Sequence, residues 1–226
     1  GAGRGIGRDI AIRFAEQGAK LVLVSRSPGP LEETLQKVRR VTPDAIAIAA
    51  DVTQEAAVEA MTRQAIAHFG RVDILINNAG ANHAMLLAES DPKAWREMID
   101  INLMAAYLCS RSVLPQMIEQ GGGKIVNLGS AASVIGYPLF SAYCAAKHAV
   151  VGLTKSLAEE VKQKNIQVNV VCPAFVDTRM TPAAFRSASM PVEQVAEVVL
   201  FLASKAADGI TGETLNIFGK QDMYSY

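Results

Sequence analysis

Residues 1–25 read GAGRGIGRDIAIRFAEQGAKLVLVS, a glycine-rich turn followed by an amphipathic segment and an apolar, β-branched run. Residues 7–17 have the pattern of a helix that follows the turn, and residues 20–25 have that of a buried strand. A right-handed βαβ unit places a strand before the turn as well. We therefore expect about ten further residues upstream of Gly1, which would form a strand at the centre of a doubly wound sheet.

The rest of the chain continues this alternation of short apolar runs and longer helical stretches. Further strands are predicted at residues 45–50, 72–77, 124–128, 166–172 and 213–217. Helices are predicted at residues 31–41, 54–69, 91–120, 141–164 and 191–203. Strands that are apolar on both faces and separated by helices indicate a parallel sheet that is covered on each side. The predicted fold class is α/β: a doubly wound (Rossmann), mainly parallel, seven-stranded sheet in one domain over residues 1–226, its first strand missing from the given chain.

Composition excludes several classes of protein. Half of the 226 residues are apolar, which is enough for a sizeable core and excludes intrinsic disorder of the whole chain. Lys plus Arg and Asp plus Glu each total 22, so the zero net charge indicates neither a nucleic-acid nor a membrane partner. Three cysteines without CxxC spacing argue against a disulfide scaffold or a cysteine zinc site. We expect a cytoplasmic protein that binds no metal.

The opening turn has the spacing of a phosphate-binding loop. Gly1, Gly5 and Gly7 follow the pattern G-x3-G-x-G. Glycines let the backbone approach a pyrophosphate, and the helix that follows offers free N–H groups to it. The alternative is that these glycines only form a tight turn.

The next predicted strand ends in Ser25 and Arg26, where a dinucleotide-binding fold usually has a carboxylate for the adenosine ribose. An arginine there accommodates a 2′-phosphate instead, and Arg4 in the glycine turn could reach the same group. The pattern favours NADP(H) over NAD(H). The alternative is that both arginines are ordinary surface residues.

Tyr143 and Lys147 stand four residues apart in YCAAK, so they project from one face of the predicted helix. An ammonium about 5 Å from a phenol oxygen favours phenolate by roughly 3 kcal/mol at an effective dielectric of about 20. The phenol pKa would then fall by roughly two units, toward the range of a general acid and base. Ser130 follows the strand predicted at residues 124–128, at the edge where open α/β sheets bind ligands. Taken alone, the YxxxK pattern could equally belong to the surface of a helix that has no catalytic function.

The order of these motifs resembles that of the short-chain dehydrogenases/reductases, in the compact single-domain group that includes the 3-oxoacyl-carrier-protein reductases. The resemblance covers nearly the whole chain. It rests on five motifs: Gly1-x3-Gly5-Ile6-Gly7, Asp51-Val52, Asn77-Asn78-Ala79-Gly80, Asn102 within IDINLMAAY, and Ser130 with Tyr143 and Lys147.

The resemblance implies a catalytic role for Asn102, Ser130, Tyr143 and Lys147. Ser130 and Tyr143 would bind a substrate carbonyl, Tyr143 would donate the proton, and Lys147 would lower the phenol pKa and bind the nicotinamide ribose. Asn102 would hold a water through which Lys147 exchanges protons. With the arginines discussed above, the predicted cofactor site comprises Gly1, Arg4, Gly5, Ile6, Gly7, Ser25, Arg26, Asp51, Val52, Asn78, Ala79, Gly80, Tyr143, Lys147, Pro173, Val176 and Thr178.

Two departures from the family pattern affect the substrate side. Pro173-Ala174 stands where the family has Pro-Gly, and residues 178–191 are short for a substrate loop. Residues 137–140 (YPLF) suggest an apolar substrate portion, although they could equally pack between subunits. The helices predicted at 91–120 and 141–164 resemble those that build a homotetramer in this family.

The predicted activity is hydride transfer between NADP(H) and a small-molecule carbonyl or secondary alcohol, with 3-oxoacyl thioesters as one substrate class. One alternative is a dinucleotide-binding sensor or partner protein without catalysis; another is an epimerase or dehydratase. An acyl-carrier-protein partner would require a basic patch near the pocket mouth, for which Lys124, Lys162 and Lys164 are candidates.

Overall fold

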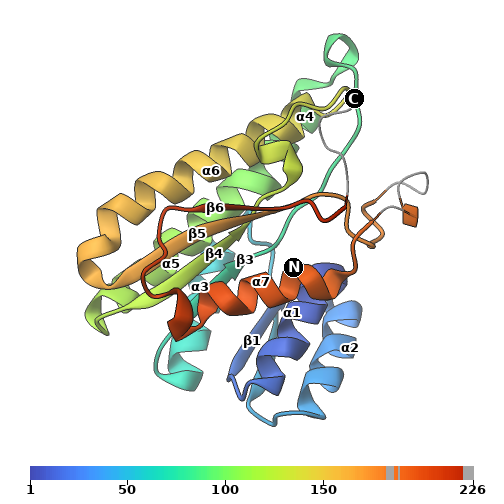
Figure 1. Cartoon of the computed structure of the whole chain (residues 1–226). Coiled ribbons are helices and arrows are strands. Elements are labelled where there is room, and N and C mark those ends of the chain that lie inside the picture. Colours follow the sequence, from blue (N-terminus) through green and yellow to red (C-terminus); the bar gives the residue numbers. More distant parts are fainter. Residues whose placement is uncertain (182–185, 188, 221–226) are drawn as a thin grey trace.

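The computed structural model describes residues 1–181, 186–187 and 189–220. Its parallel strands and covering helices confirm the predicted α/β class (Figure 1). The strands are β1 (Leu21–Ser25), β2 (Ala45–Ala49), β3 (Ile74–Asn77), β4 (Gly123–Leu128), β5 (Ile166–Pro173) and β6 (Thr214–Ile217). The α-helices are α1 (Gly5–Glu16), α2 (Pro28–Arg39), α3 (Glu55–Phe69), α4 (Pro92–Ile99), α5 (Ala105–Glu119), α6 (Ser141–Val161) and α7 (Val192–Ala203).

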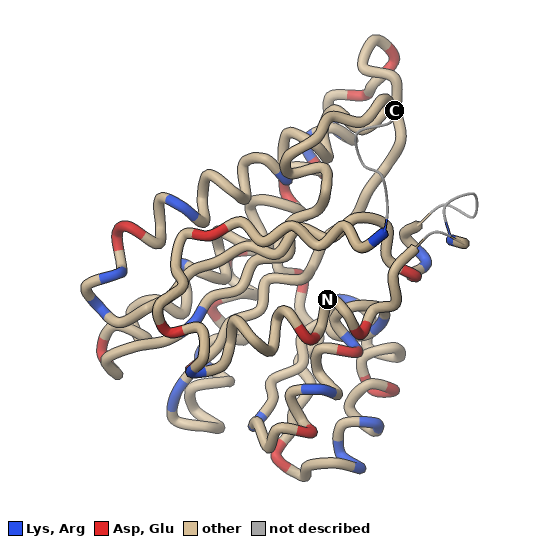
Figure 2. The backbone as a smooth tube through the Cα atoms, in the orientation of Figure 1, with Lys and Arg blue, Asp and Glu red and all other residues tan. Residues whose placement is uncertain are grey.

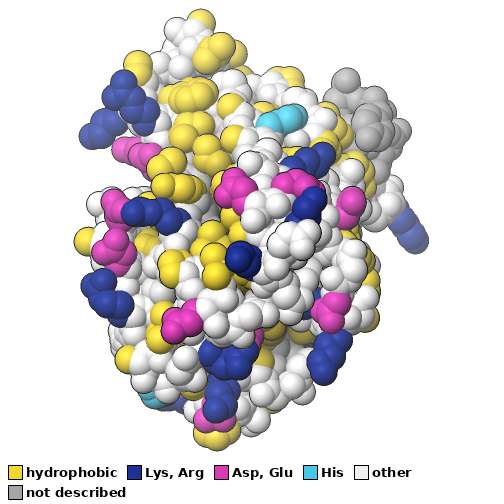
Figure 3. Space-filling model, turned by 90° about the vertical axis from the view of Figure 1, so that its left-hand side faces the viewer, with side chains coloured by type: hydrophobic (Ala, Val, Ile, Leu, Met, Phe, Trp, Pro, Cys, Tyr) yellow, Lys and Arg dark blue, Asp and Glu magenta, His cyan; other side chains and the backbone are white. Residues whose placement is uncertain are grey.

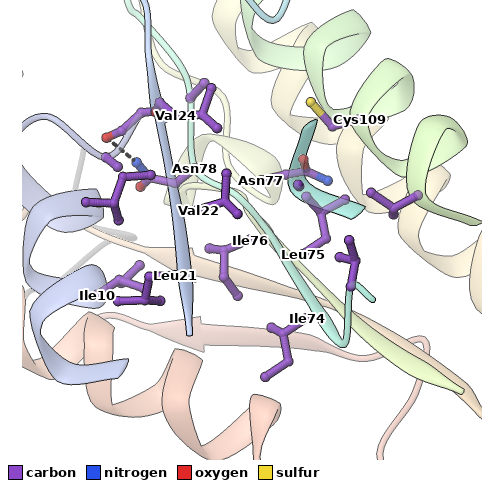
Figure 4. Close-up of a pocket in the computed structure, with 18 of the residues that line it drawn as sticks. Ile10, Leu21, Val22, Val24, Ile74, Leu75, Ile76, Asn77, Asn78 and Cys109 are labelled. Carbon is purple, nitrogen blue, oxygen red and sulfur yellow. Dashed lines mark hydrogen bonds between the residues drawn. The ribbon is translucent and has the colours of Figure 1, made fainter. Parts of the chain in front are cut away.

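The sheet consists of two parts. Strands β1 and β2 pair in parallel, and β3, β4, β5 and β6 form a parallel sheet in that order. Between β1 and β3 lies a cavity of about 520 Å³, and Figure 4 shows Val22, Ile74 and Ile76 in the space between the two strands.

Helices cover both faces of the sheet. Helices α1, α2 and α7 pack on one face, with Phe14 and Val199 in the same apolar cluster as Val171 of β5. Helices α3, α5 and α6 pack on the other face, where Met117 and Leu157 contact Ile125 of β4. Because every strand is parallel, all the carboxyl ends meet at one edge, the right-hand end in Figure 1.

The predicted helix over residues 91–120 is divided. Helix α4 begins as expected, with Asp91 accepting a hydrogen bond from the Lys93 N–H and Pro92 in the first turn. A π-helical turn, Asp100–Met104, then separates α4 from α5. Apolar periodicity did not reveal this turn, because one wider turn inside a helix hardly changes the spacing of apolar residues.

Other boundaries shift by a few residues. Helix α2 starts at Pro28 rather than at residue 31, because Pro28 and Pro30 fit the first turn of a helix, where no N–H partner is needed. Helix α1 starts at Gly5, two residues before its predicted start. None of the helices in the described ranges is long and apolar enough to cross a membrane.

Candidate active site

The predicted catalytic side chains lie at the carboxyl ends of β3 and β4. Ser130 follows β4 and is the N-cap of a short 3₁₀ helix (Ala131–Ser133), where its hydroxyl accepts a hydrogen bond from the Ala132 N–H at 3.2 Å. Tyr143 lies in the first turn of α6, and its phenol shares a hydrogen bond with the Ser130 side chain. Ser130 and Tyr143 are therefore in direct contact.

Lys147 lies one turn further along α6 and is buried. Its Nζ donates a hydrogen bond to the Leu128 carbonyl at 2.7 Å and lies 5.8 Å from the centroid of the Tyr143 ring. Burial lowers the pKa of the Lys147 ammonium to about 8. The side chain can therefore exchange a proton at a pH close to neutral.

The phenol behaves differently from the sequence expectation. Burial raises the pKa of Tyr143, and the hydrogen bond from Ser130 opposes that rise only in part. We expected Lys147 to bring the phenol pKa below its usual value, and for this structure that expectation is wrong. The physical reason is that desolvation penalises the phenolate, while the ammonium is bound to the Leu128 carbonyl.

Asn102 lies in the π-helical turn and is buried. Its Nδ2 donates to the carbonyls of Ala81 at 2.8 Å and Met98 at 2.9 Å, and its Oδ1 accepts from the Ala81 N–H. A Cβ built on Gly80 would lie 2.8 Å from Asn102 Oδ1 and 3.6 Å from Lys147 Nζ. The structure thus brings Asn102 and Lys147 together around a glycine that leaves no room for a side chain.

The glycine turn forms a cradle that side chains would fill. A Cβ on Gly7 would lie 2.3 Å from the Gly1 carbonyl oxygen, and one on Gly1 would lie 2.6 Å from Asn78 Nδ2. Asn78 Nδ2 donates to the Gly1 carbonyl at 3.1 Å, as Figure 4 shows. Arg4 provides no side-chain cap for α1, so the first turn keeps N–H groups for an anion. These features fit the pyrophosphate of a dinucleotide.

The predicted adenosine end lies beside the turn. Asp51 accepts hydrogen bonds from the Thr53 N–H and hydroxyl at 3.0 and 2.8 Å. These bonds lower its pKa, with a smaller contribution from the Arg26 charge. Arg4 and Arg26 are exposed and form no ion pair with any residue in the described ranges. The buried Val52 side chain packs into the core beneath β2, so only its backbone is available to a cofactor.

The predicted nicotinamide end comes from the segment after β5. A Cβ on Gly5 would lie 3.4 Å from Thr178 Cγ2, so this segment reaches the glycine turn. Val176 is buried and forms a β-bridge with Met190, which joins the two ends of the substrate loop. Residues 182–185 and 188 lie outside the described residues, so the predicted shortness of this loop is not tested.

Two further side chains lie against Ser130, the predicted catalytic serine, and the sequence analysis did not identify them. Ser133 Oγ accepts a hydrogen bond from the Ser130 N–H at 3.1 Å, and the Cys172 thiol interacts with both the Ser133 hydroxyl and the Ser130 N–H. The spacing Ser130-x-x-Ser133, typical of a capping box, could have revealed the first of these. No local signal places Cys172 there, because it comes from a different strand.

The lysines proposed for a carrier-protein patch do not border this site. Lys124 is bound to Asp208 and the Ser204 carbonyl, both at 2.7–2.8 Å, and Lys162 forms an ion pair with Glu159. Lys124 lies near the start of β4, and Lys162 and Lys164 precede β5, so all three lie at the amino-terminal edge of the sheet. The candidate patch is therefore wrong. Figure 2 shows basic and acidic residues interspersed along the described chain.

Within the described ranges, no group of three His, Cys, Asp or Glu side chains is arranged to hold a metal ion. The predicted catalytic residues and the glycine turn share one edge of a parallel sheet, which is the ligand-binding edge of such folds.

Comparison with known proteins agrees with this arrangement. The sequence profile of the short-chain dehydrogenases matches residues 1–189. The 3-oxoacyl-[acyl-carrier-protein] reductase FabG of Staphylococcus aureus is 35% identical over 236 residues, covering 99% of this chain and 96% of that protein. A 3-ketoacyl-(acyl-carrier-protein) reductase from Brucella melitensis, complexed with NADH, is 33% identical with a TM-score of 0.92, covering 97% of this chain and 95% of that one. A levodione reductase is 33% identical with a TM-score of 0.91, covering 96% and 93%.

The resemblance that the motifs indicated is thus confirmed over nearly the whole chain. The relatives share both the sequence pattern and the fold that brings the motifs together. This chain belongs to the short-chain dehydrogenase family of oxidoreductases.

Proposed function

We propose that this protein is an NADP(H)-dependent reductase of small carbonyl compounds, and that 3-oxoacyl thioesters are its substrate class. The observation that carries the proposal is the contact of Ser130 with Tyr143, with Lys147 beside them, at the same sheet edge as the glycine turn. The names of the relatives, two of them 3-oxoacyl carrier-protein reductases, support the choice of substrate class.

The roles of the side chains follow from their positions. The Ser130 hydroxyl and the Tyr143 phenol donate hydrogen bonds to the substrate carbonyl oxygen. When bound, the nicotinamide supplies a hydride to the carbonyl carbon. The raised pKa of Tyr143 keeps the phenol protonated at neutral pH, so it can give its proton to the oxygen as the alcohol forms. Lys147, whose pKa is about 8, then returns a proton to the phenolate.

Replacing Tyr143 with Phe tests the acid role. The ring and its packing against Phe140, at a centroid distance of 6.5 Å, are kept while the proton donor is lost. We expect turnover of acetoacetyl-coenzyme A with NADPH to fall at least about a hundredfold. The dissociation constant for NADPH should change little. Turnover within threefold of the wild type would contradict the assignment.

Tyr107→Phe is the matched control, because this tyrosine lies on α5 with 39% of its surface exposed. It should leave turnover unchanged. A sensor without catalysis would instead bind NADPH while the wild type shows no turnover with any carbonyl compound.

The preference for NADP(H) is proposed from Arg4 and Arg26. Both residues are exposed. Arg26 directly follows β1, which ends in Ser25 rather than in a carboxylate, and Arg4 lies in the glycine turn, where the Ala2 N–H donates to the Val24 carbonyl of β1. Arginine pairs well with a phosphate dianion, so Arg26→Ala should weaken NADPH binding about tenfold. NADH binding should not change, and Arg40→Ala, an exposed change at the end of α2, should affect neither cofactor. Tighter binding of NADH than of NADPH by the wild type would reject the preference.

We also propose a homotetramer in the cytoplasm. Tyr107 and Ile118 on α5 expose 39% and 43% of their surfaces, and Figure 3 shows hydrophobic side chains gathered in a band on one face of the molecule. Burial of such apolar surface between subunits is favourable. All three cysteines are free thiols, which is typical of a reducing compartment.

A further inference from the structure

Two buried side chains, Ser133 and Cys172, contact the backbone of Ser130 and have no part in the proposed reaction. Ser133 Oγ accepts a hydrogen bond from the Ser130 N–H at 3.1 Å, and the Ser130 side chain accepts one from the Ser133 backbone, so the two residues form a capping box. The Cys172 thiol of β5 interacts with the same N–H and with the Ser133 hydroxyl. Ser133 and Cys172 are 2% and 0% exposed. They therefore act inside the protein rather than on a ligand.

Gly129 shows how tightly this pair is fitted. A Cβ at this position would lie 2.6 Å from Cys172 Sγ and 2.9 Å from Ser133 Oγ. The two side chains thus occupy the space in front of the Gly129 Cα and contact the backbone immediately before Ser130. The position of the Ser130 backbone depends on both.

The orientation of the Ser130 hydroxyl follows from its backbone. Its oxygen accepts the Ala132 N–H at 3.2 Å, and its proton is then directed to Tyr143. A change in the φ and ψ of Ser130, which are −167° and 166°, would break this chain of hydrogen bonds. The geometry of the Ser130–Tyr143 pair therefore depends on the buried residues that hold the Ser130 backbone.

We propose that Ser133 and Cys172 are positioning residues that together fix the Ser130 hydroxyl on the Tyr143 phenol. This role rests on the proposed function, because Ser130 and Tyr143 are taken to bind and protonate the substrate. Ser133 acts through the Ser130 backbone. Cys172 contacts the same backbone, and it also lies close enough to Tyr143 and Lys147 for charge on its sulfur to raise the pKa of both.

The test uses Ser133→Ala and Cys172→Ala in the full chain. Each change should lower kcat for acetoacetyl-coenzyme A reduction with NADPH about fivefold to tenfold, while KM for NADPH stays within twofold. The double variant should lose little more than either single variant, because the pair acts as a unit. Cys172→Ser keeps a hydrogen-bonding group and should recover most of kcat.

A second measurement reports the phenol directly. Losing the hydrogen bond from Ser130 to the phenolate should raise the pKa of Tyr143 further. Alcohol oxidation, which needs the phenolate, should then move to higher pH in Ser133→Ala. In Cys172→Ala the shift should be smaller, because the charge of Cys172, which raises the phenol pKa, is lost at the same time. Spectrophotometric titration, taken as the difference between each variant and the same variant with Tyr143→Phe, measures the phenol without turnover.

Cys109→Ala is the matched control, because it is the same substitution at another buried thiol. Cys109 lies on α5, is 5% exposed and packs in a different apolar cluster. It should move neither kcat nor the titration. If Ser133→Ala leaves the Tyr143 titration unchanged, the positioning role is rejected. A wild type inactive toward carbonyl compounds would reject the proposed function instead, and the titration would still decide the positioning role.

Discussion

Single residues at the active site have properties that follow from burial more than from their immediate neighbours. The Tyr143 pKa is raised and the Lys147 pKa lowered by the same cause, the removal of water from a charged form. Both shifts favour the neutral form of the side chain. Leu139 has a strained backbone, because its φ of 70° lies in the left-handed region, which is unfavourable for leucine.

Leu139→Gly should raise the free energy of unfolding by about 1 kcal/mol or less. Glycine adopts a positive φ without strain, and this gain is reduced by the greater freedom of glycine in the unfolded chain. Leu86→Gly is the control, because Leu86 is similarly exposed, 54% against 45%, but has an ordinary φ of −65°. Urea denaturation of both variants measures the difference. An equal loss of stability in the two variants would show that strain at Leu139 is not the cause.

At the scale of secondary-structure elements, the packing of two helices determines which charged side chains lie close together. Helices α1 and α7 pack together, and their polar faces bring Asp9 near Glu193 and Glu197. Arg13 lies 3.2 Å from Glu197 but 3.8 Å from Asp9, so it compensates the aspartate only weakly. Burial, followed by the charge of Glu193, raises the pKa of Asp9 above its usual value.

Asp9→Asn should therefore stabilise the protein at pH 7 by about 0.5 kcal/mol. A carboxyl whose pKa is raised on folding lowers stability as pH rises from its unfolded value through its folded value. The gain from the amide should thus be present at neutral pH, decrease as pH falls through the folded and unfolded pKa values, and disappear below about pH 3, where aspartate is protonated in both states. Thermal unfolding at both pH values measures it.

Glu59→Gln on α3 is the matched control, because Glu59 is exposed and lies 3.7 Å from Arg63. It should give no gain at either pH. A gain from Asp9→Asn that is equal at about pH 7 and about pH 3.5 would contradict the electrostatic explanation.

At the scale of the whole molecule, the sheet is in two parts that helices hold together. The cavity of about 520 Å³ separates β1 and β2 from the other strands. Ile10 and Phe14 of α1 share an apolar cluster with Val195 and Val199 of α7, which covers β4 and β5. This contact links α1, which follows the glycine turn, to the part of the sheet that carries the predicted catalytic residues.

The exposed apolar side chains of α5 lead to a prediction about assembly. Tyr107→Glu with Ile118→Glu should convert the proposed tetramer to smaller species, because charges are poorly tolerated in a buried interface. Sedimentation velocity measures the change, and far-UV circular dichroism checks that the variant remains folded. A wild type that sediments as a stable, active monomer would reject the tetramer.

The amino-acid sequence alone predicted the fold class, the order of the strands and helices, and the residues of the candidate site. It could do so because strand and helix periodicity, helix caps and short motifs are local properties of a chain. Gly1, Gly5 and Gly7 indicated a cofactor turn, and the spacing of Tyr143 and Lys147 indicated one face of a helix.

Only the tertiary structure decided how these groups act on each other. Desolvation depends on everything that surrounds a side chain, so the raised pKa of Tyr143 could not be inferred from its distance to one lysine. The contact of Cys172 with the Ser130 N–H joins residues from different strands, and no spacing along the chain predicts it.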